Sequence, residues 1–182
     1  MAQVITAQQA VELIQDGATV ALGGFGSYCG PDALLDALAC RYDETGHPAN
    51  LTLMTGVCTG DNSQNDLGMN RIAKDGLIDT IIAAHLGNPP KISAMAAENR
   101  IAAYTLPLGV VMHLFRAIAG KKPGVLTHVG LNTFADPRES GCKVNDRARS
   151  QEREVVRLVE FGGKEQLFYP SIPLDVCLIR GT

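Results

Sequence analysis

A glycine-rich segment at residues 16–31 contains the residues with the clearest potential for chemistry. Its apolar run, Ala18–Leu22, is followed by three closely spaced glycines, Gly23, Gly24 and Gly26. A turn before the run and glycines after it predict a buried strand that ends in a tight loop. Such a loop leaves backbone N–H groups uncovered by side chains. These groups bind a phosphate, a carboxylate, or a carbonyl oxygen that becomes negative during a reaction.

Two common glycine motifs do not fit this loop. A dinucleotide-binding loop has the pattern Gly-x-Gly-x-x-Gly, and counted from Gly24 the last glycine is replaced by Cys29. The next expected strand also ends without the acidic residue that would bind a ribose. A nucleotide phosphate loop contains Gly-Lys-Ser/Thr, which the chain lacks. The segment therefore predicts a site for an anionic or polarised group of another kind.

Two further loops are expected to join this site. Residues 51–55 are predicted to form a strand that leads into a loop at Gly56, and residues 77–84 a strand that leads to His85 and Gly87. Ligands of parallel sheets bind beyond the carboxyl ends of the strands. We therefore expect these two loops and the loop at Gly23 to gather along one edge of a sheet.

The elements that must position these loops alternate along the chain. Thr6 and Gln9 form a capping-box pattern that begins a first helix, and Pro31 begins a second, since proline suits a first helical position. Further helices are predicted near residues 68–76, 91–98 and 108–119, and a fourth strand at 101–104. Strands that alternate with helices predict an α/β fold, with a mostly parallel sheet and helices on both faces.

The pattern changes after residue 124. Residues 155–161 and 164–169 are predicted to be the arms of a hairpin around Gly162-Gly163, and residues 173–179 one more strand. The C-terminal part is therefore expected to be rich in β-hairpin structure. Because the last residues directly follow a strand, we expect residues 1–182 to form one domain that is incomplete at its C-terminus.

Composition excludes several classes of protein. The chain has 182 residues and a net charge of −3, which does not favour binding to nucleic acid. No apolar run approaches the ~18 residues of a membrane helix, and the N-terminus lacks a basic region before an apolar one. The five cysteines are widely spread without a Cys-x-x-Cys pair, so reduced thiols are favoured over disulfides or a metal site. We expect a cytoplasmic protein.

The glycine loop and much of the chain resemble a known family. Asp16-Gly17, Gly23-Gly24-Phe25 and a proline six residues after Phe25 resemble the N-terminal signature of the family I coenzyme A transferases. The later sequence resembles the acetate/propionate branch of that family, at Gly124-Val125, Thr127, Gly130, Thr133-Phe134, Asp136-Pro137-Arg138, Gly141, Lys143, Asn145, Val159-Glu160 and Leu167-Phe168-Tyr169. Three positions depart from the pattern. Cys29 stands where the family usually has a small residue, often glycine, and Cys142 where glycine is usual. Leu108 replaces a glutamine near the acyl site.

The resemblance implies a fold and a reaction. The fold would be NagB/RpiA/CoA transferase-like, and the chain would be the N-terminal, alpha-half portion of a short-chain acyl-CoA:carboxylate CoA-transferase of ketone-body or propionate metabolism. In such enzymes a glutamate attacks the thioester, and an acyl-glutamyl anhydride and then a glutamyl-CoA thioester form. The catalytic glutamate belongs to the second half. The chain by itself would therefore contain no catalytic residue and be inactive.

The resemblance also implies site residues and partners. Substrate-binding residues would be Gly23, Gly24, Phe25, Gly26, Gly56, His85 and Gly87. Coenzyme A would be a substrate, with no cofactor and no metal. The partners would be a coenzyme A thioester, a small carboxylate and the missing beta half, in a homo-oligomer without contacts to nucleic acid or membrane.

Several residues have a simpler interpretation beside the functional one. Glu160, before Gly162-Gly163, imitates a catalytic turn, but a surface glutamate of a hairpin is the preferred interpretation. Cys29 could be a nucleophile at a helix start or a small filler, and Lys121 and Lys122 could bind a CoA phosphate or be a solvated helix end. The chain as a whole could instead be a non-catalytic ligand- or sugar-phosphate-binding module, or an inactive truncated product.

Overall fold

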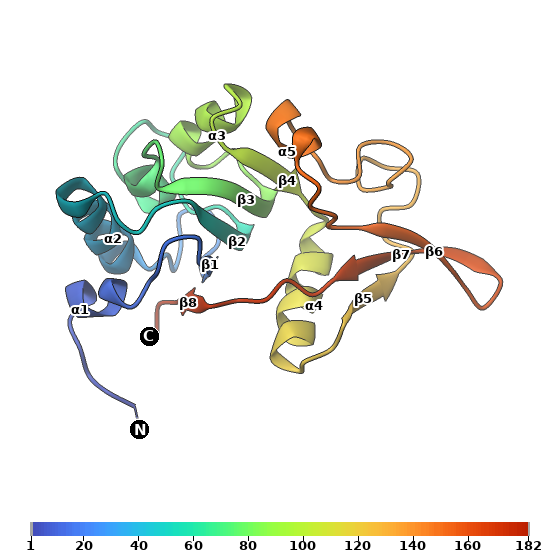
Figure 1. The fold of residues 1–182 in the computed structure, drawn as a ribbon, viewed down its shortest axis with the longest axis horizontal. Helices are drawn as coiled ribbons and strands as arrows, with labels where there is room; N and C mark the ends of the chain where they lie inside the picture. The colour runs from blue at the N-terminus through green and yellow to red at the C-terminus, as the bar shows by residue number, and fades with distance from the viewer. Residues whose placement is uncertain (1, 182) are drawn as a thin grey trace.

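Five parallel strands form the main sheet in a computed structural model that describes residues 2–181 (Figure 1). The strand order is β4-β3-β2-β1-β8. All seven residues of β2 are buried, as expected for a central strand covered on both faces. The bounds are β1 Thr19–Leu22, β2 Leu51–Val57, β3 Ile78–His85, β4 Ala102–Thr105 and β8 Val176–Leu178. The predicted parallel sheet is confirmed.

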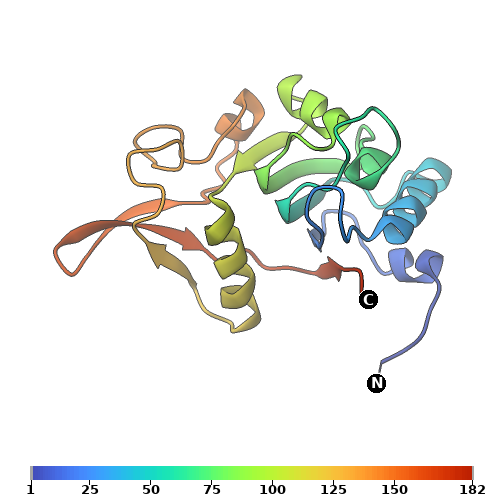
Figure 2. The ribbon, with the colours of Figure 1, turned by 180° about the vertical axis from the view of Figure 1, so that it is seen from behind.

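Helices cover the two faces of this sheet unequally. One face packs against α1 (Ala7–Glu12), α2 (Asp32–Thr45), the 3₁₀ helix η1 (Gly68–Ile72) and α3 (Pro90–Ala97). The other face packs against α4 (Leu108–Ala119), which contacts β2 and β3. Figure 2 shows the sheet from the opposite side. The alternation of side chains along a strand separates the two cores: Ile81 points into one and Ile82 into the other.

The sequence signals at helix ends are confirmed in the structure. The Thr6 hydroxyl accepts the N–H of Gln9, and the Gln9 side chain accepts the N–H of Thr6, which completes the capping box of α1. Pro31 is the N-cap of α2, one residue before the first helical position predicted for it, and Gly46 ends the helix in the left-handed region with φ 72°. The helix expected over residues 68–76 is shorter, since η1 ends at Ile72.

A second, antiparallel sheet follows α4 and extends away from the main sheet (Figure 1). Its order is β5-β7-β6, with bounds β5 Gly124–Thr127, β6 Arg157–Phe161 and β7 Lys164–Pro170. Gly162 and Gly163 have φ of 61° and 72°, as a tight hairpin turn requires, so the predicted hairpin is confirmed. The pattern did not predict α5 (Asp146–Ser150), which begins where the Asn145 side chain accepts the N–H of Ala148.

The loop between β5 and α5 is held by one buried carboxylate. Asp136 accepts hydrogen bonds from the backbone N–H of Asn132 at 2.9 Å and from the Arg138 guanidinium at 2.8 Å. The pKa of Asp136 is held well below its ordinary value by the Arg138 side chain, the backbone N–H of Asn132 and the backbone N–H of Arg138.

Across residues 2–181, no helix has the length and apolar character needed to cross a membrane.

Candidate functional site

The loops that follow β1, β2 and β3 meet at the carboxyl edge of the main sheet. The N–H of Gly60 donates to the carbonyl oxygen of Gly26 at 3.1 Å, and the Ser27 hydroxyl donates to the carbonyl oxygen of Gly60 at 3.0 Å. The Asn88 side-chain amide donates to the carbonyl oxygen of Cys58 at 3.2 Å. These bonds join all three loops, as the order of strands and helices predicts. We call this region the loop cluster, residues 23–30, 57–61 and 85–89.

Glycine is needed in the β1 loop for two physical reasons. A Cβ atom at Gly24 would lie 2.5 Å from the Thr59 Cγ2 atom, and the φ of Gly24 is 112°. Gly26 takes the first central position of a two-residue turn, with φ 57°. Phe25 and Tyr28 close this turn, each donating its N–H to the other's carbonyl oxygen at 2.9 and 3.0 Å. Gly24 is therefore needed because Thr59 lies close to its Cα atom, and Gly26 because the turn requires a positive φ.

Only part of the loop has free amides. The N–H of Gly23 donates to the carbonyl oxygen of Leu178 at 2.9 Å, so Gly23 is committed to holding β8. The N–H of Phe25 is committed to the turn. Within residues 2–181, the amides of Gly24, Gly26 and Cys29 form no hydrogen bond. The set of free N–H donors is thus smaller than the sequence suggested. Of the predicted site glycines in the β1 loop, Gly24 and Gly26 keep a free N–H and Gly23 does not.

Of the remaining predicted residues, His85 and Gly87 lie in the loop cluster and Gly56 does not. His85 pairs in register with Val57 and is exposed, and a Cβ at Gly87 would lie 2.9 Å from His85 Nε2. Gly56 instead lies inside β2, because that strand continues to Val57. It is buried, and its missing side chain would meet the Met112 Cε atom of α4 at 2.6 Å.

Gly56 forms part of a trough that sequence reasoning missed. The trough has a volume of about 600 Å³ and lies between α4 and the strands β1, β2 and β8. We call it the α4 trough; its lining residues are Ala21, Leu22, Gly23, Gly24, Gly56, Met112, Phe115, Ile118, Ala119, Leu174, Cys177 and Ile179. Because Gly23 and Gly24 line it, the trough opens beside the loop cluster. The sequence of α4 does indicate the trough. A helix that buries one face needs apolar side chains on that face alone, whereas α4 also has apolar side chains outside its buried face.

The structure explains two of the three departures from the family pattern. Cys29 and Cys142 have φ of 57° and 67°, in the left-handed region that favours glycine. Cys142 is buried, and burial raises the pKa of its thiol to about 12. Leu108, the third departure, begins α4, and its Cδ1 atom lies 3.3 Å from the position of a Cβ at Gly56. It therefore adds to the apolar wall beside the trough.

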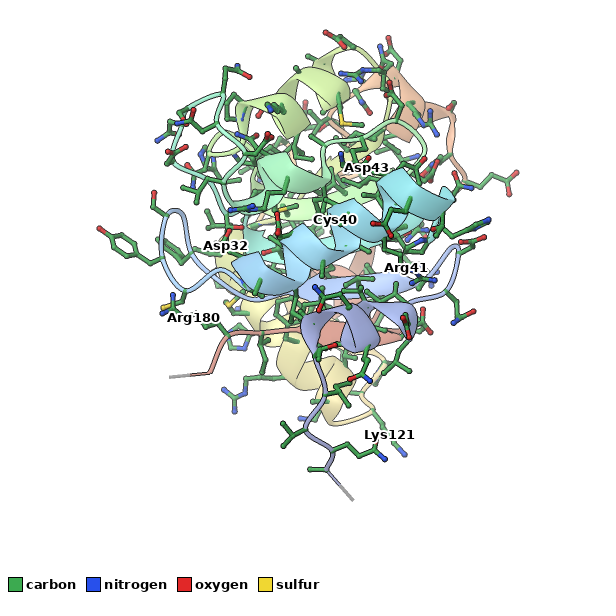
Figure 3. The ribbon with its side chains drawn as sticks, turned by 90° about the vertical axis from the view of Figure 1, so that its left-hand side faces the viewer. Asp32, Cys40, Arg41, Asp43, Lys121 and Arg180 are labelled. Carbon is green, nitrogen blue, oxygen red and sulfur yellow. The ribbon has the colours of Figure 1, made fainter. Side chains whose placement is uncertain are left out.

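The carboxylates beside the loop cluster are engaged in structural hydrogen bonds. Asp32 accepts the N–H of Gly68 at 2.9 Å. Asp61 accepts both the hydroxyl and the backbone N–H of Ser63, which lower its pKa. Glu160 lies on β6, opposite Glu165 in the hairpin sheet, which extends away from the loop cluster (Figure 1). Lys121 is exposed just past the end of α4 (Figure 3).

Comparison with known proteins gives one consistent result. The profile of a family described as coenzyme A transferase matches residues 4–182. The caffeate CoA-transferase of Acetobacterium woodii is 42% identical over 182 residues, covering 100% of this chain and 34% of that protein. The acetate CoA-transferase YdiF of Escherichia coli strain K12 is 38% identical over 180 residues, covering 98% of this chain and 33% of that protein. The chain thus spans about a third of the length of these curated relatives.

A solved structure and a more distant relative extend this result. The acyl-CoA transferase YdiF of Escherichia coli O157:H7, solved as a thioester complex with CoA, superimposes with a TM-score of 0.91 and 36% identity. The match covers 98% of this chain and 34% of that one. The probable coenzyme A transferase subunit alpha of Bacillus subtilis strain 168 is 25% identical over 176 residues, covering 97% of this chain and 66% of that subunit. The similarity therefore includes both sheets and the loop cluster.

Proposed function

This chain belongs to the coenzyme A transferase family, and we propose that it supplies the loop-cluster half of an acyl-CoA:carboxylate CoA-transferase. The observation that carries the proposal is the meeting of the three strand-end loops, with the free amides of Gly24 and Gly26 beside the α4 trough. A thioester needs donors for its carbonyl oxygen and a space for its acyl group. The loop cluster and the trough offer both within one region.

In this proposal the nucleophile comes from a complementary part of the enzyme. A glutamate carboxylate attacks the thioester carbonyl carbon, the carbon–sulfur bond breaks, and the CoA thiolate leaves as an anhydride forms. The thiolate then attacks the glutamyl carbonyl carbon and releases the first acid as its carboxylate. A second carboxylate reverses these steps and leaves as the new CoA thioester. The engaged carboxylates beside the loop cluster support a nucleophile from outside this chain.

The amides of Gly24 and Gly26 have a defined task in this scheme. Each attack places negative charge on a carbonyl oxygen, which fixed N–H donors stabilise at about 3 Å. Removal of one such donor typically lowers the rate about 10²- to 10³-fold. His85, Gly87 and Phe25 would line the approach of the CoA thioester, since the first two lie in the same cluster and Phe25 is exposed at the turn.

The proposed substrates are acetyl- or propionyl-type CoA thioesters and a small free carboxylate. The acetate CoA-transferase named among the relatives supports a short acyl group. The 42% identical caffeate CoA-transferase shows that the family also includes a larger acid, so the acyl group has to be measured directly.

The test is complementation. The chain would be joined to the two thirds of the E. coli acetate CoA-transferase that it does not match, and CoA exchange between propionyl-CoA and acetate would be followed. We expect exchange by the joined protein and none by the chain alone. Without acceptor acid, mass spectrometry should find CoA attached to a glutamate of the added part. A folded joined protein without exchange or adduct would refute the proposal. If calorimetry then showed that the chain binds sugar phosphates, the result would favour the alternative of a non-catalytic binding module.

A further inference from the structure

Asn88, in the loop after β3, lies against both of the other loops of the loop cluster. Its side-chain Nδ2 donates to the carbonyl oxygen of Cys58 at 3.2 Å, and its backbone carbonyl oxygen accepts the N–H of Asn62 at 2.9 Å. Both partners belong to the loop after β2. On the side of the loop after β1, a Cβ atom at Gly26 would lie 3.3 Å from Asn88 Nδ2. The Asn88 carboxamide therefore lies between the β2 loop and the glycine turn.

The bond to Cys58 leaves one N–H of this carboxamide free. A carbonyl oxygen only accepts hydrogen bonds, so the nitrogen of the carboxamide faces Cys58. That nitrogen carries two N–H groups, and one of them makes this bond. Within residues 2–181 the second donates to no protein acceptor, and the side chain is half-buried. The second N–H of Asn88 is therefore available to a ligand of the loop cluster.

This donor lies close to the free amide of Gly26. A Cβ atom lies about 2.5 Å from the nitrogen of its own residue in standard geometry. The Gly26 nitrogen and Asn88 Nδ2 are therefore at most about 6 Å apart. An oxygen atom that accepts from two donors at about 3 Å each requires a separation no larger than this. One carbonyl oxygen can thus accept from Gly26 and Asn88 together.

We infer that Asn88 is a further catalytic residue, whose second N–H donates with the amide of Gly26 to the carbonyl oxygen of the thioester as it becomes negative. This inference rests on the proposed function for the identity of the ligand. It adds a side-chain donor to a site that the sequence predicted from backbone amides alone. A carboxamide does not titrate, so it donates at every pH at which the attacking carboxylate is ionised.

The alternative is that Asn88 only holds the loops together, and Asn70 provides a matched comparison for it. The Asn70 carboxamide uses both of its N–H groups, donating to the carbonyl oxygens of Ser63 at 2.8 Å and Asn65 at 2.9 Å. Its Oδ1 atom accepts the N–H of Lys91 at 3.1 Å, and the residue is buried. Asn70 therefore has a structural task with no donor to spare, whereas Asn88 has one.

Exchange kinetics of the joined protein described above separate these two roles. Asn88→Ala should lower kcat about 10²-fold, as the loss of one such donor does. KM for propionyl-CoA should change by less than about threefold, because the donor acts in the transition state. Asn88→Asp keeps the shape of the side chain and removes its N–H donors, so it should lower kcat at least as far. Asn70→Ala should lower the stability to urea and leave kcat within about twofold where the protein is folded.

The carbonyl stretching frequency of a bound ligand gives a readout that does not need turnover. The probe is the ketone analogue of propionyl-CoA, with a methylene group in place of sulfur and an isotope label at the carbonyl carbon. Hydrogen bonds to a carbonyl oxygen lower its stretching frequency. Infrared difference spectra should therefore show a higher frequency in Asn88→Ala than in the unmodified joined protein, and no change in Asn70→Ala.

The outcomes distinguish this inference from the proposed function. Exchange by the unmodified joined protein, with kcat and carbonyl frequency unchanged in Asn88→Ala, would overturn the inference and leave the proposed function intact. Equal losses of kcat in Asn88→Ala and Asn70→Ala would also overturn it, since both residues would then act through loop structure. Absence of exchange by the unmodified joined protein would refute the proposed function, and the carbonyl frequency would still decide the role of Asn88. A ketone analogue that fails to bind the unmodified joined protein would overturn both.

Discussion

The amide nitrogen of Gly60 lies 3.1 Å from the carbonyl oxygen of Gly26 and joins the loop after β2 to the loop after β1. This bond places two backbone segments from different strands in direct contact. Both residues joined by this bond are glycines, so we expect a single added methyl group at either position to disturb the contact.

Gly60→Ala should destabilise the protein more than Gly56→Ala. A Cβ at Gly60 would lie 2.5 Å from the backbone oxygen of Asn88, which cannot move without shifting the β3 loop. A Cβ at Gly56 would lie 2.6 Å from the flexible end of Met112, which can rotate away. We expect a loss of about 2–3 kcal/mol at Gly60 and under about 1 kcal/mol at Gly56, from the usual cost of overpacking. Urea unfolding measures both, and equal losses would contradict the structure.

Gly24→Ala should lower both the stability of the protein and the rate of CoA exchange, because the new side chain strains the backbone and collides with Thr59. Its φ of 112° disfavours any side chain, and the new methyl group would meet Thr59 Cγ2. We expect a loss of about 1–3 kcal/mol from the strained backbone, with more from the contact. Adding Thr59→Ser removes the Cγ2 atom. The double variant should therefore regain the stability lost through the contact with Thr59, but not the stability lost through the strained backbone.

Gly17→Ala is the control for this variant. Gly17 also has positive φ, at 72°, but no neighbouring atom within 4 Å of its Cβ position. It should cost about 1–2 kcal/mol, and Thr59→Ser should not rescue it. In the joined protein, CoA exchange should fall for Gly24→Ala and stay unchanged for Gly17→Ala at temperatures where both are folded.

Cys29→Gly should stabilise the chain slightly. The left-handed backbone at Cys29 costs an ordinary residue about 1–2 kcal/mol, and glycine loses about 0.5–1 kcal/mol in greater unfolded-state freedom. The expected net gain is therefore between zero and about 1.5 kcal/mol. Cys40→Gly, inside α2, should have the opposite sign because glycine is a poor helix former. Thermal unfolding of the two variants measures the sign of each stability change. A loss of stability for Cys29→Gly would contradict the left-handed backbone conformation of Cys29.

The stabilising effect of Asp136 should disappear in acid. The Arg138 guanidinium and the N–H of Asn132 hold its pKa below the unfolded value, which is about 4. A depressed pKa contributes stability above the unfolded pKa, and the contribution is lost as pH falls from about 4 toward the folded pKa. The difference in unfolding free energy between the unmodified chain and Asp136→Asn should therefore be constant near pH 7 and shrink below about pH 4.

Asp146→Asn provides the comparison for this pH profile. Asp146 pairs with Arg149 at 2.7 Å on the exposed surface of α5, where ion pairs contribute little. Its substitution should change stability by under about 1 kcal/mol at every pH. A pH profile for Asp136→Asn as flat as this one would show that Asp136 is not a structural anion.

Much of the local structure could be predicted from the sequence because it depends on short-range rules. The Thr6–Gln9 capping box, the hairpin at Gly162-Gly163 and the twelve residues of α4 follow from side-chain spacing and backbone preference. The alternation of strands and helices also predicted that the loops after β1, β2 and β3 would meet. That prediction holds because carboxyl ends of parallel strands lie at one edge.

The tertiary structure decided what no local pattern contains. It placed Gly56 inside β2 facing Met112, because the length of a strand depends on its neighbours in the sheet. It committed the amide of Gly23 to Leu178, 155 residues away in the sequence, so that of the three predicted site glycines in the β1 loop only Gly24 and Gly26 keep a free N–H. It also set α4 over β2 and β3 and left β1 and β8 bare on that face. How far a helix reaches across a sheet depends on long-range packing, which the spacing of residues within the helix does not encode.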